Sequence, residues 1–203
     1  MRIILIGANG IIGRAIDHAM SESHDLIRVG RTSGDLHADI AKPENLRVLF
    51  ENAAPYDAVI CAAGEAAFGS LTGLSDKDFQ LGLNSKLMGQ VNLVRLGLSS
   101  MSDGGSFTLT SGVLAHHPIP ESASISIVNA GVEAFAKAAA LGLPRGIRIN
   151  VVSPPWVSET LKALGRNPAS GLPASVVAKA YVASVEGRMT GEVLDAQAYA
   201  GNA

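Results

Sequence analysis

Short aliphatic segments alternate with amphipathic ones from one end of the chain to the other. Residues 2–6 and 57–61 are apolar runs closed by glycine or alanine, which is typical of buried strands. Residues 11–21 carry apolar side chains at helical spacing, and Pro43 suits the first turn of another helix. Because repeated strand–helix units favour parallel pairing with helices on both faces, the sequence predicts a doubly wound parallel α/β sheet.

The same alternation continues through the rest of the chain. Further strands are expected at 25–30, 106–111, 147–152 and 192–195, and helices at 76–101, 122–142 and 173–186. The segment 154–172 is rich in proline and glycine and is expected to be irregular. No repeat, low-complexity tract or linker divides the chain, so one domain over residues 1–203 is expected.

Composition excludes several classes of protein. With 47% apolar and 17% charged residues among 203, the chain can bury a substantial core, which excludes disorder as its main state. A net charge of −2 argues against nucleic acid and against an anionic membrane surface as partners. No apolar run approaches the ~20 residues of a membrane span. The single cysteine, Cys61, cannot form an internal disulfide, so a cytoplasmic location is expected.

A glycine-rich turn lies between the first expected strand and the first expected helix. Gly7 permits a tight turn, Gly10 lets backbone approach a pyrophosphate, and Gly13 lets the helix pack closely on the strand. The helix N-terminus offers unpaired N–H groups to phosphate. The spacing is G-x-x-G-x-x-G, and an ordinary strand–helix turn is the alternative. The cofactor contacts expected in this loop are Gly7, Asn9, Gly10, Ile12 and Gly13.

The end of the second expected strand indicates which dinucleotide would bind. An acidic residue there binds the 2′-hydroxyl of NAD, whereas an arginine suits the 2′-phosphate of NADP. Arg31, followed by Thr32, occupies this place, and Asp35 comes too late. The sequence therefore favours NADP over NAD, with a solvated loop arginine as the alternative.

Two more segments are expected to line the cofactor. Asp39 and Ile40 are placed to flank the adenine ring, although Asp39 serves equally well as a cap for the helix near Pro43. Ala62-Ala63-Gly64 closes the strand at 57–61, where small side chains would let a cofactor lie against the backbone.

Five segments, in this order, resemble the short-chain dehydrogenase/reductase family over about residues 3–196. They are the glycine loop at 7–13, Cys61-Ala62-Ala63-Gly64, the strand at 106–112, the strand at 147–154 and the closing strand at 190–194. The resemblance implies a Rossmann-type fold and hydride transfer between NAD(P) and a carbonyl or alcohol. It also implies a tyrosine acid/base, a lysine four residues later, a serine that orients the substrate oxygen, and an asparagine on the long central helix.

Only part of that catalytic set is present. Ser111 stands where the family has its serine. The tyrosine falls on Ile125, which has no proton to give, and the lysine falls on Asn129, which carries no charge. When the central helix is aligned on Gly89, Lys86 takes the place of the asparagine.

The loops after the last catalytic strands depart from the family as well. The Pro-Gly motif reads Pro154-Pro155-Trp156, and Thr160 is expected to contact the nicotinamide amide. His116 and His117 follow Ser111 and could supply a proton, since histidine titrates near neutral pH; two solvent-facing histidines are the alternative. No cluster of metal ligands accompanies them, so no metal is expected.

Two functions fit these observations. The first is an NADP-dependent oxidoreductase acting on a small carbonyl or alcohol, with His116, His117 or Lys86 beside Ser111 as an unusual proton donor. The second is a non-catalytic NADP(H)-binding sensor or partner subunit, because the cofactor half is intact while the chemical half is replaced. Substrate identity does not follow from the sequence.

The helices at 76–101 and 122–142 resemble those that pair subunits in this family, so a homodimer or homotetramer is expected. The apolar residues expected on their outer faces are Leu87, Val91, Val94, Leu98, Val132, Phe135 and Ala139. The alternative is that these side chains face the sheet.

Overall fold

The structure, a computed structural model that describes residues 1–201, contains a seven-stranded sheet. Residues 202–203, the end of the expected domain span, lie outside the described residues. The strands are β1 (Arg2–Ile6), β2 (Asp25–Gly30), β3 (Leu36–His37), β4 (Tyr56–Cys61), β5 (Met101–Thr110), β6 (Arg148–Ser153) and β7 (Val193–Asp195). Their order is β3-β2-β1-β4-β5-β6-β7, and every neighbouring pair is parallel. The predicted doubly wound parallel sheet is confirmed.

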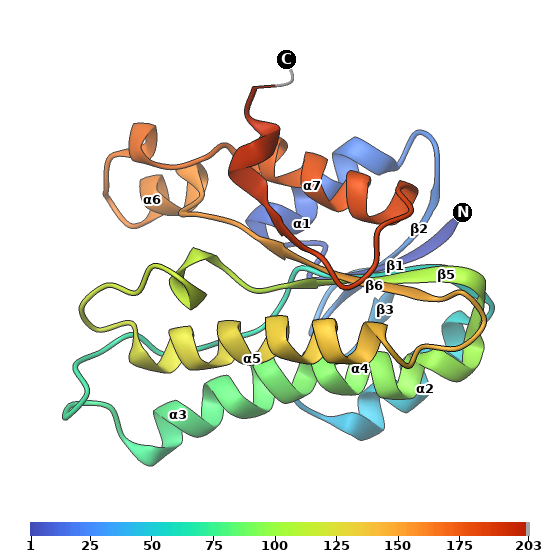
Figure 1. Ribbon diagram of the computed structural model, residues 1–203, viewed down its shortest axis with the longest axis horizontal. Helices are drawn as coiled ribbons and strands as arrows, with labels where there is room; N and C mark the ends of the chain where they lie inside the picture. Colours follow the sequence, from blue (N-terminus) through green and yellow to red (C-terminus); the bar gives the residue numbers. More distant parts are fainter. Residues whose placement is uncertain (202–203) are drawn as a thin grey trace.

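Helices cover both faces of this sheet (Figure 1). On one face α1 (Ile11–Met20) packs against α7 (Ala174–Glu186), and the other face carries α2 (Pro43–Ala53), α4 (Gly89–Gly97) and α5 (Ala123–Ala140). The strand order reverses between β1 and β4, which is where α/β sheets of this kind bind ligands, beyond the carboxyl ends of the strands. Within residues 1–201, no helix is both long and apolar enough to cross a membrane.

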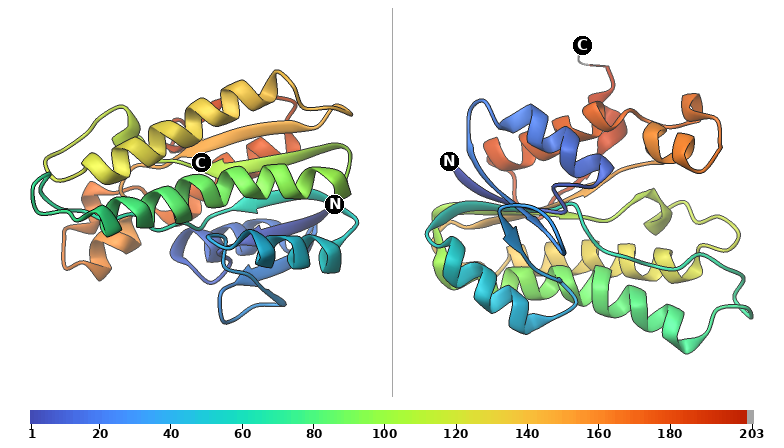
Figure 2. Two further views of the ribbon diagram at one scale, coloured as in Figure 1. Left: turned by 90° about the horizontal axis from the view of Figure 1, so that it is seen from below. Right: turned by 180° about the vertical axis from the view of Figure 1, so that it is seen from behind.

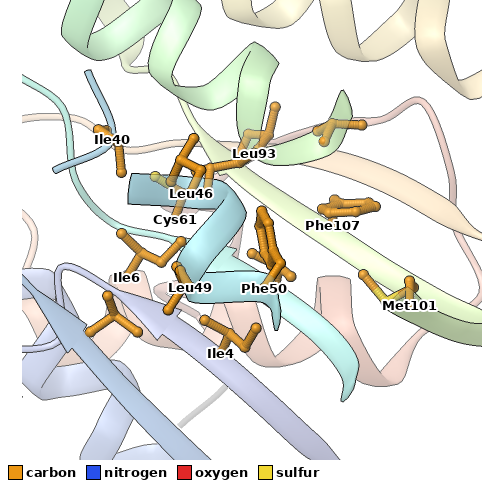
Figure 3. Close-up of a cluster of buried hydrophobic side chains, with 14 of the residues drawn as sticks. Ile4, Ile6, Ile40, Leu46, Leu49, Phe50, Cys61, Leu93, Met101 and Phe107 are labelled. Atoms are coloured by element: carbon orange, nitrogen blue, oxygen red, sulfur yellow. The ribbon is translucent and has the colours of Figure 1, made fainter. Parts of the chain in front are cut away.

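Each face of the sheet closes an apolar core. Alternate residues of β1 point to opposite faces: Ile4 and Ile6 are buried beneath α2 and α4, while Ile3 and Leu5 are buried beneath α1 and α7. Burial on both faces explains why β1 is aliphatic at every position from Ile3 onwards. Figure 3 shows the first core, which includes Ile4, Ile6, Leu46, Leu49, Phe50, Leu93, Met101 and Phe107.

The structure departs from the expected elements in three places. β3 is too short to leave a sequence pattern. The single helix expected at 76–101 is interrupted: α3 (Asp76–Gly82) leads into a π-helical turn, η1 (Leu83–Met88), before α4 begins. The segment expected to be irregular contains α6 (Ser158–Ala163), which projects beyond the carboxyl ends of the strands (Figure 2). The short 3-10 turns are η2 (Leu98–Ser100), η3 (Val113–Ala115), η4 (Pro168–Ser170) and η5 (Ala196–Tyr199).

The expected outward-facing helix residues lie mostly inward. Val94 and Val132 are buried in the core beneath the sheet, so their predicted exposure is wrong. Helices α4 and α5 use these positions to cover the sheet, as the alternative interpretation held. Four others are partly buried against the same core, namely Leu87, Leu98, Phe135 and Ala139. The large apolar side chains exposed on α3, η1 and α5 include Leu81, Met88 and Ile127.

The glycine loop makes the closest backbone contact at the centre of the sheet. A Cβ atom on Gly13 would overlap the carbonyl oxygen of Gly7, so α1 can approach β1 only because Gly13 has no side chain. Gly7 has a φ of +83°, and a Cβ atom there would lie 2.6 Å from the carbonyl oxygen of Ala62. Glycine at both positions holds α1 and the ends of β1 and β4 together.

Replacing Gly13 with alanine is therefore expected to destabilise the fold by about 3 kcal/mol, since an added methyl group in a closed contact forces backbone movement. Gly142→Ala is the matched control, because a Cβ atom there meets no atom closer than 4.0 Å. Urea unfolding followed by circular dichroism measures both variants. Equal midpoints for the two would show that the loop absorbs the methyl group without strain.

Candidate active site

Two cavities lie beyond the carboxyl ends of the central strands, and both are lined by Ala62, Ala63 and Gly64 from the segment after β4. One, of about 330 Å³, runs along the glycine loop and the end of β2. The other, of about 360 Å³, lies beside the ends of β5 and β6. The segment Ala62–Gly64 is their shared wall, so the two cavities lie on either side of it at the point where the strand order reverses.

The first cavity collects most of the residues expected to bind a cofactor. They are Gly7, Asn9, Gly10, Arg31, Thr32, Asp39 and Ile40. Gly13 does not line it and instead sets the position of α1. The Asn9 amide nitrogen donates to the Ser33 hydroxyl at 2.8 Å, which ties the glycine loop to the segment after β2. Asp39 lines the cavity and also accepts the Ala41 N–H at 3.0 Å, so it holds the turn before α2 as well.

An ion pair spans this cavity. Arg31 Nη2 lies 2.6 Å from Glu65 Oε1, and the two side chains, 63% and 47% exposed, come from the segments after β2 and β4. Exposed pairs contribute about 0–1 kcal/mol, so a doubly charged phosphate can displace the carboxylate. Sequence reasoning missed Glu65 because, after the strand at 57–61, it considered only the small residues Ala62–Gly64 and sought charged groups only after the second strand.

The second cavity has a mainly apolar wall with a few polar groups. The expected site residues that line it are Ile12, Lys86, Ser111, Pro154 and Thr160. Ile125 and Asn129, the positions predicted to replace the family's tyrosine and lysine, line it too. Phe68 and Trp156 also line it, with ring centroids 5.9 Å apart. The position predicted for the acid/base therefore brings an aliphatic side chain to the cavity wall.

Lys86 is a buried amine at the border of this cavity. It lies on the π-helical turn η1, and a Cβ atom on Gly64 would lie 3.0 Å from its Cγ. Its amine has no hydrogen-bond or ion-pair partner among residues 1–201. Burial lowers the pKa of Lys86 to about 8, with the nearby Cys61 acting weakly in the opposite direction. Asn84, two residues earlier, lines neither cavity.

Ser111, Glu133 and His116 form a hydrogen-bonded chain. The Ser111 hydroxyl donates to Glu133 Oε1 at 2.7 Å, and His116 Nε2 lies 2.5 Å from Glu133 Oε2. Glu133 is buried on α5 with its side chain 4% exposed, whereas His116 is 57% exposed. Ser111 lines the cavity and His116 does not. His116 is therefore connected to the site through the Glu133 carboxylate.

Sequence reasoning missed Glu133. A usable signal was available, because it is the only acidic residue on α5 and follows Asn129 by four residues, which places both on one helix face. Asn129 itself donates weakly to the Gly112 carbonyl oxygen at 3.4 Å, and its Oδ1 is buried with no partner among the described residues.

The thiol of Cys61, at the end of β4, is a further group with reactive chemistry. Burial raises the pKa of the Cys61 thiol to about 11, which makes it a poor nucleophile. Over residues 1–201, no group of three or more His, Cys, Asp or Glu side chains is arranged to hold a metal ion.

Comparison with known proteins identifies the family. A family model described as enoyl-(acyl carrier protein) reductase matches residues 7–190. The structure of the protein lin1944 from Listeria innocua is 41% identical, with a TM-score of 0.92 over 96% of this chain and 98% of that one. A small-chain dehydrogenase solved in complex with NADPH is 25% identical, with a TM-score of 0.85 over 99% of both chains. The chain belongs to the short-chain dehydrogenase/reductase family.

A curated relative is similar over a shorter stretch. Tetrahydroxynaphthalene reductase PfmaG of Pestalotiopsis fici is 31% identical over 136 residues, which are 64% of this chain and 49% of that protein. The chain thus matches about half the length of this reductase.

Lys86 makes a testable contribution to stability. Its charged form is disfavoured in the folded protein, and a pKa depression from 10.5 to about 8 corresponds to roughly 3 kcal/mol. Below pH 8 the amine is charged in both the folded and unfolded states, so the folded state bears the full penalty. Above pH 10.5 the amine is neutral in both states and the penalty disappears.

Lys86→Met is therefore expected to be more stable than the wild type below pH 8, and the difference is expected to shrink as the pH rises towards 10.5. Urea unfolding at several pH values measures this. Lys77→Met, on the exposed side of α3, is the matched control. A difference between Lys86→Met and wild type that did not change with pH would show that packing, rather than charge, governs this position.

Proposed function

We propose that this chain binds NADP(H) across the two adjacent cavities and transfers a hydride between that cofactor and a small carbonyl or alcohol. The observation that carries the proposal is that the cavity of Arg31 and the cavity of Ser111 lie side by side, with a shared wall built from the small residues Ala62–Gly64. Residues suited to an anion line the first cavity. A serine and a buried amine line the second cavity.

The residues present fit a dinucleotide. Gly10 caps α1 without a side-chain hydrogen bond, so the first N–H groups of a ten-residue helix are free for a pyrophosphate. Gly7 and Gly64 both line the cavity and carry no side chain that could project into it. The unpartnered Oδ1 of Asn129 can accept a hydrogen bond from the cofactor or the substrate. When bound, the cofactor supplies or accepts the hydride.

The chain's own contribution at the reacting end centres on Lys86. Below pH 8 its ammonium is charged and faces a cavity of low polarity, where a cation stabilises negative charge strongly. During reduction such charge develops on the substrate oxygen. Lys86 thus stabilises the oxygen, and Thr160 and Pro154 border the place expected for the nicotinamide.

A non-catalytic NADP(H)-binding sensor or partner subunit is the second candidate. What supports it is that Ile125, at the position predicted for the family's acid/base, places in the cavity wall an aliphatic side chain that offers no proton. Both candidates require the cofactor, and only the first requires turnover.

Cofactor binding is tested by calorimetric titration with NADPH and NADH. Arg31→Ala is expected to weaken the affinity for NADPH at least about tenfold and to leave the affinity for NADH nearly unchanged, because only NADPH carries the 2′-phosphate. Glu65→Gln is expected to increase the affinity for NADPH severalfold, because Arg31 then has no ion pair to break before it binds the phosphate.

Arg47→Ala, an exposed arginine on α2, is the control for lost positive charge. Equal affinity of the wild type for NADPH and NADH would contradict the assignment to NADP. No binding of either nucleotide would contradict both candidate functions.

We also propose that the protein forms a homodimer or homotetramer and resides in the cytoplasm. Exposed Leu81 and Met88 on α3 and η1, together with Ile127 on α5, give these helices an apolar outer surface that a second subunit would cover. The buried, unpaired Cys61 suits a reducing compartment. Light scattering after size-exclusion chromatography is expected to give a multiple of 20.9 kDa, and a monomer at micromolar concentration would refute the assembly.

A further inference from the structure

Glu133 is a buried carboxylate whose presence the packing of α5 does not explain. Val128, Val132 and Ala136 on the same helix are buried and apolar, while the buried polar Asn129 lies one turn before Glu133. Removing a carboxylate from water costs several kcal/mol, and its hydrogen bonds offset only part of this cost. Both oxygens of Glu133 are used, one by Ser111 and the other by His116.

The direction of the hydrogen bond at Ser111 decides what the cavity can recognise there. A serine has one O–H, and Ser111 donates it to Glu133 at 2.7 Å. The Ser111 oxygen therefore presents only lone pairs to the cavity. A substrate group that meets it must donate a hydrogen bond, as the hydroxyl of an alcohol does.

We propose that Glu133 is the proton acceptor behind Ser111 for an alcohol substrate. This inference rests on the proposed function. As the alcohol is oxidised, its O–H bond breaks and the proton joins Ser111 Oγ, while the original Ser111 proton passes to Glu133 Oε1. The C–H bond breaks with its electron pair going to NADP⁺, and the C=O bond forms. One hydride and one proton leave the alcohol, and reduction of a carbonyl follows the same steps in reverse.

His116 completes the arrangement on the solvent side. Its ring lies against Glu133 Oε2, opposite the oxygen that faces Ser111, and more than half of its side chain is exposed. It stabilises the ionised carboxylate and connects it to bulk water, which the buried Glu133 does not reach by itself. Ser111 is thus the residue that touches substrate, and Glu133 and His116 act through it as positioning residues.

Glu133→Gln separates this role from a structural one. Glutamine has nearly the same volume and still accepts the Ser111 hydrogen bond, but it cannot take up the proton. Turnover is measured on a panel of secondary alcohols with NADP⁺ and of the matching ketones with NADPH. We expect kcat to fall about 10²–10⁴-fold, with KM and the NADPH dissociation constant nearly unchanged.

The second arm uses Ser111→Ala and the Ser111→Ala/Glu133→Gln double variant. If Glu133 acts through Ser111, the double variant is no slower than Ser111→Ala alone, because effects of residues that act as a unit are not additive. His116→Ala is expected to reduce kcat, whereas His18→Ala, which removes an exposed histidine on α1, is the matched control and is expected to match the wild type. If Glu133→Gln does not fold, the kcat of His116→Ala still tests the proposal.

An NMR measurement on the free protein tests the hydrogen-bonded chain of Ser111, Glu133 and His116 without any substrate. In heteronuclear NMR spectra of the free protein, the ring signals of His116 are expected to move in Glu133→Gln, whereas those of His117 are expected to stay in place. Unchanged His116 signals would overturn the hydrogen-bonded chain.

The remaining outcomes separate this inference from the proposed function. A wild type that binds no nicotinamide nucleotide refutes the proposed function and this inference with it. Turnover that Glu133→Gln leaves unchanged, or effects of Ser111→Ala and Glu133→Gln that multiply, overturns the inference and leaves the function standing. A wild type that binds NADPH but turns over no member of the panel overturns the inference and favours the sensor.

Discussion

The contact between the glycine loop and the end of β4 determines where everything else in the site lies. Gly7 and Gly13 let α1, β1 and the Ala62 carbonyl approach at backbone distance, and this approach leaves the segment Ala62–Gly64 as a thin wall between two cavities. A side chain on Gly13 would push α1 away from the end of β1, and one on Gly7 would push away the segment after β4. The two cavities therefore depend on close backbone packing, and the polar groups around them are placed by the strands that end there.

The fold was readable from the sequence because its signals are local. The aliphatic run of β1, the glycine loop and the helical spacing after it each depend on neighbours in the chain. They predicted the parallel sheet, and most of the residues expected to contact a cofactor line one cavity. The interest in Lys86 came from the resemblance, with the central helix aligned on Gly89. The turn η1 then brings that side chain to the cavity border.

What the sequence did not reveal depends on tertiary contacts. Glu65 meets Arg31 only because the segments after β2 and β4 face each other across a cavity, and Glu133 meets Ser111 only because α5 packs over the end of β5. In the same way, helical spacing at Val94 and Val132 identified an apolar stripe without showing that the stripe faces the sheet. A pattern within one element, such as the spacing of Glu133 from Asn129, can single out a charged residue, but it does not show which residue of a distant element the charge meets.

The π-helical turn η1 has a consequence for the helical phase of the long segment that contains it. α3 contacts α5, whereas α4 contacts both α5 and α2, so the continuous segment takes on a second neighbouring helix after this turn. Each residue of an α-helix advances by about 100° around the axis, and a π turn holds one residue more than an α turn. That additional residue rotates α4 relative to α3 and widens the helix at the turn that carries Lys86. The side chain that gives the cavity its positive charge therefore lies where the segment changes phase, and a deletion of one residue there would move the charge as well as the packing.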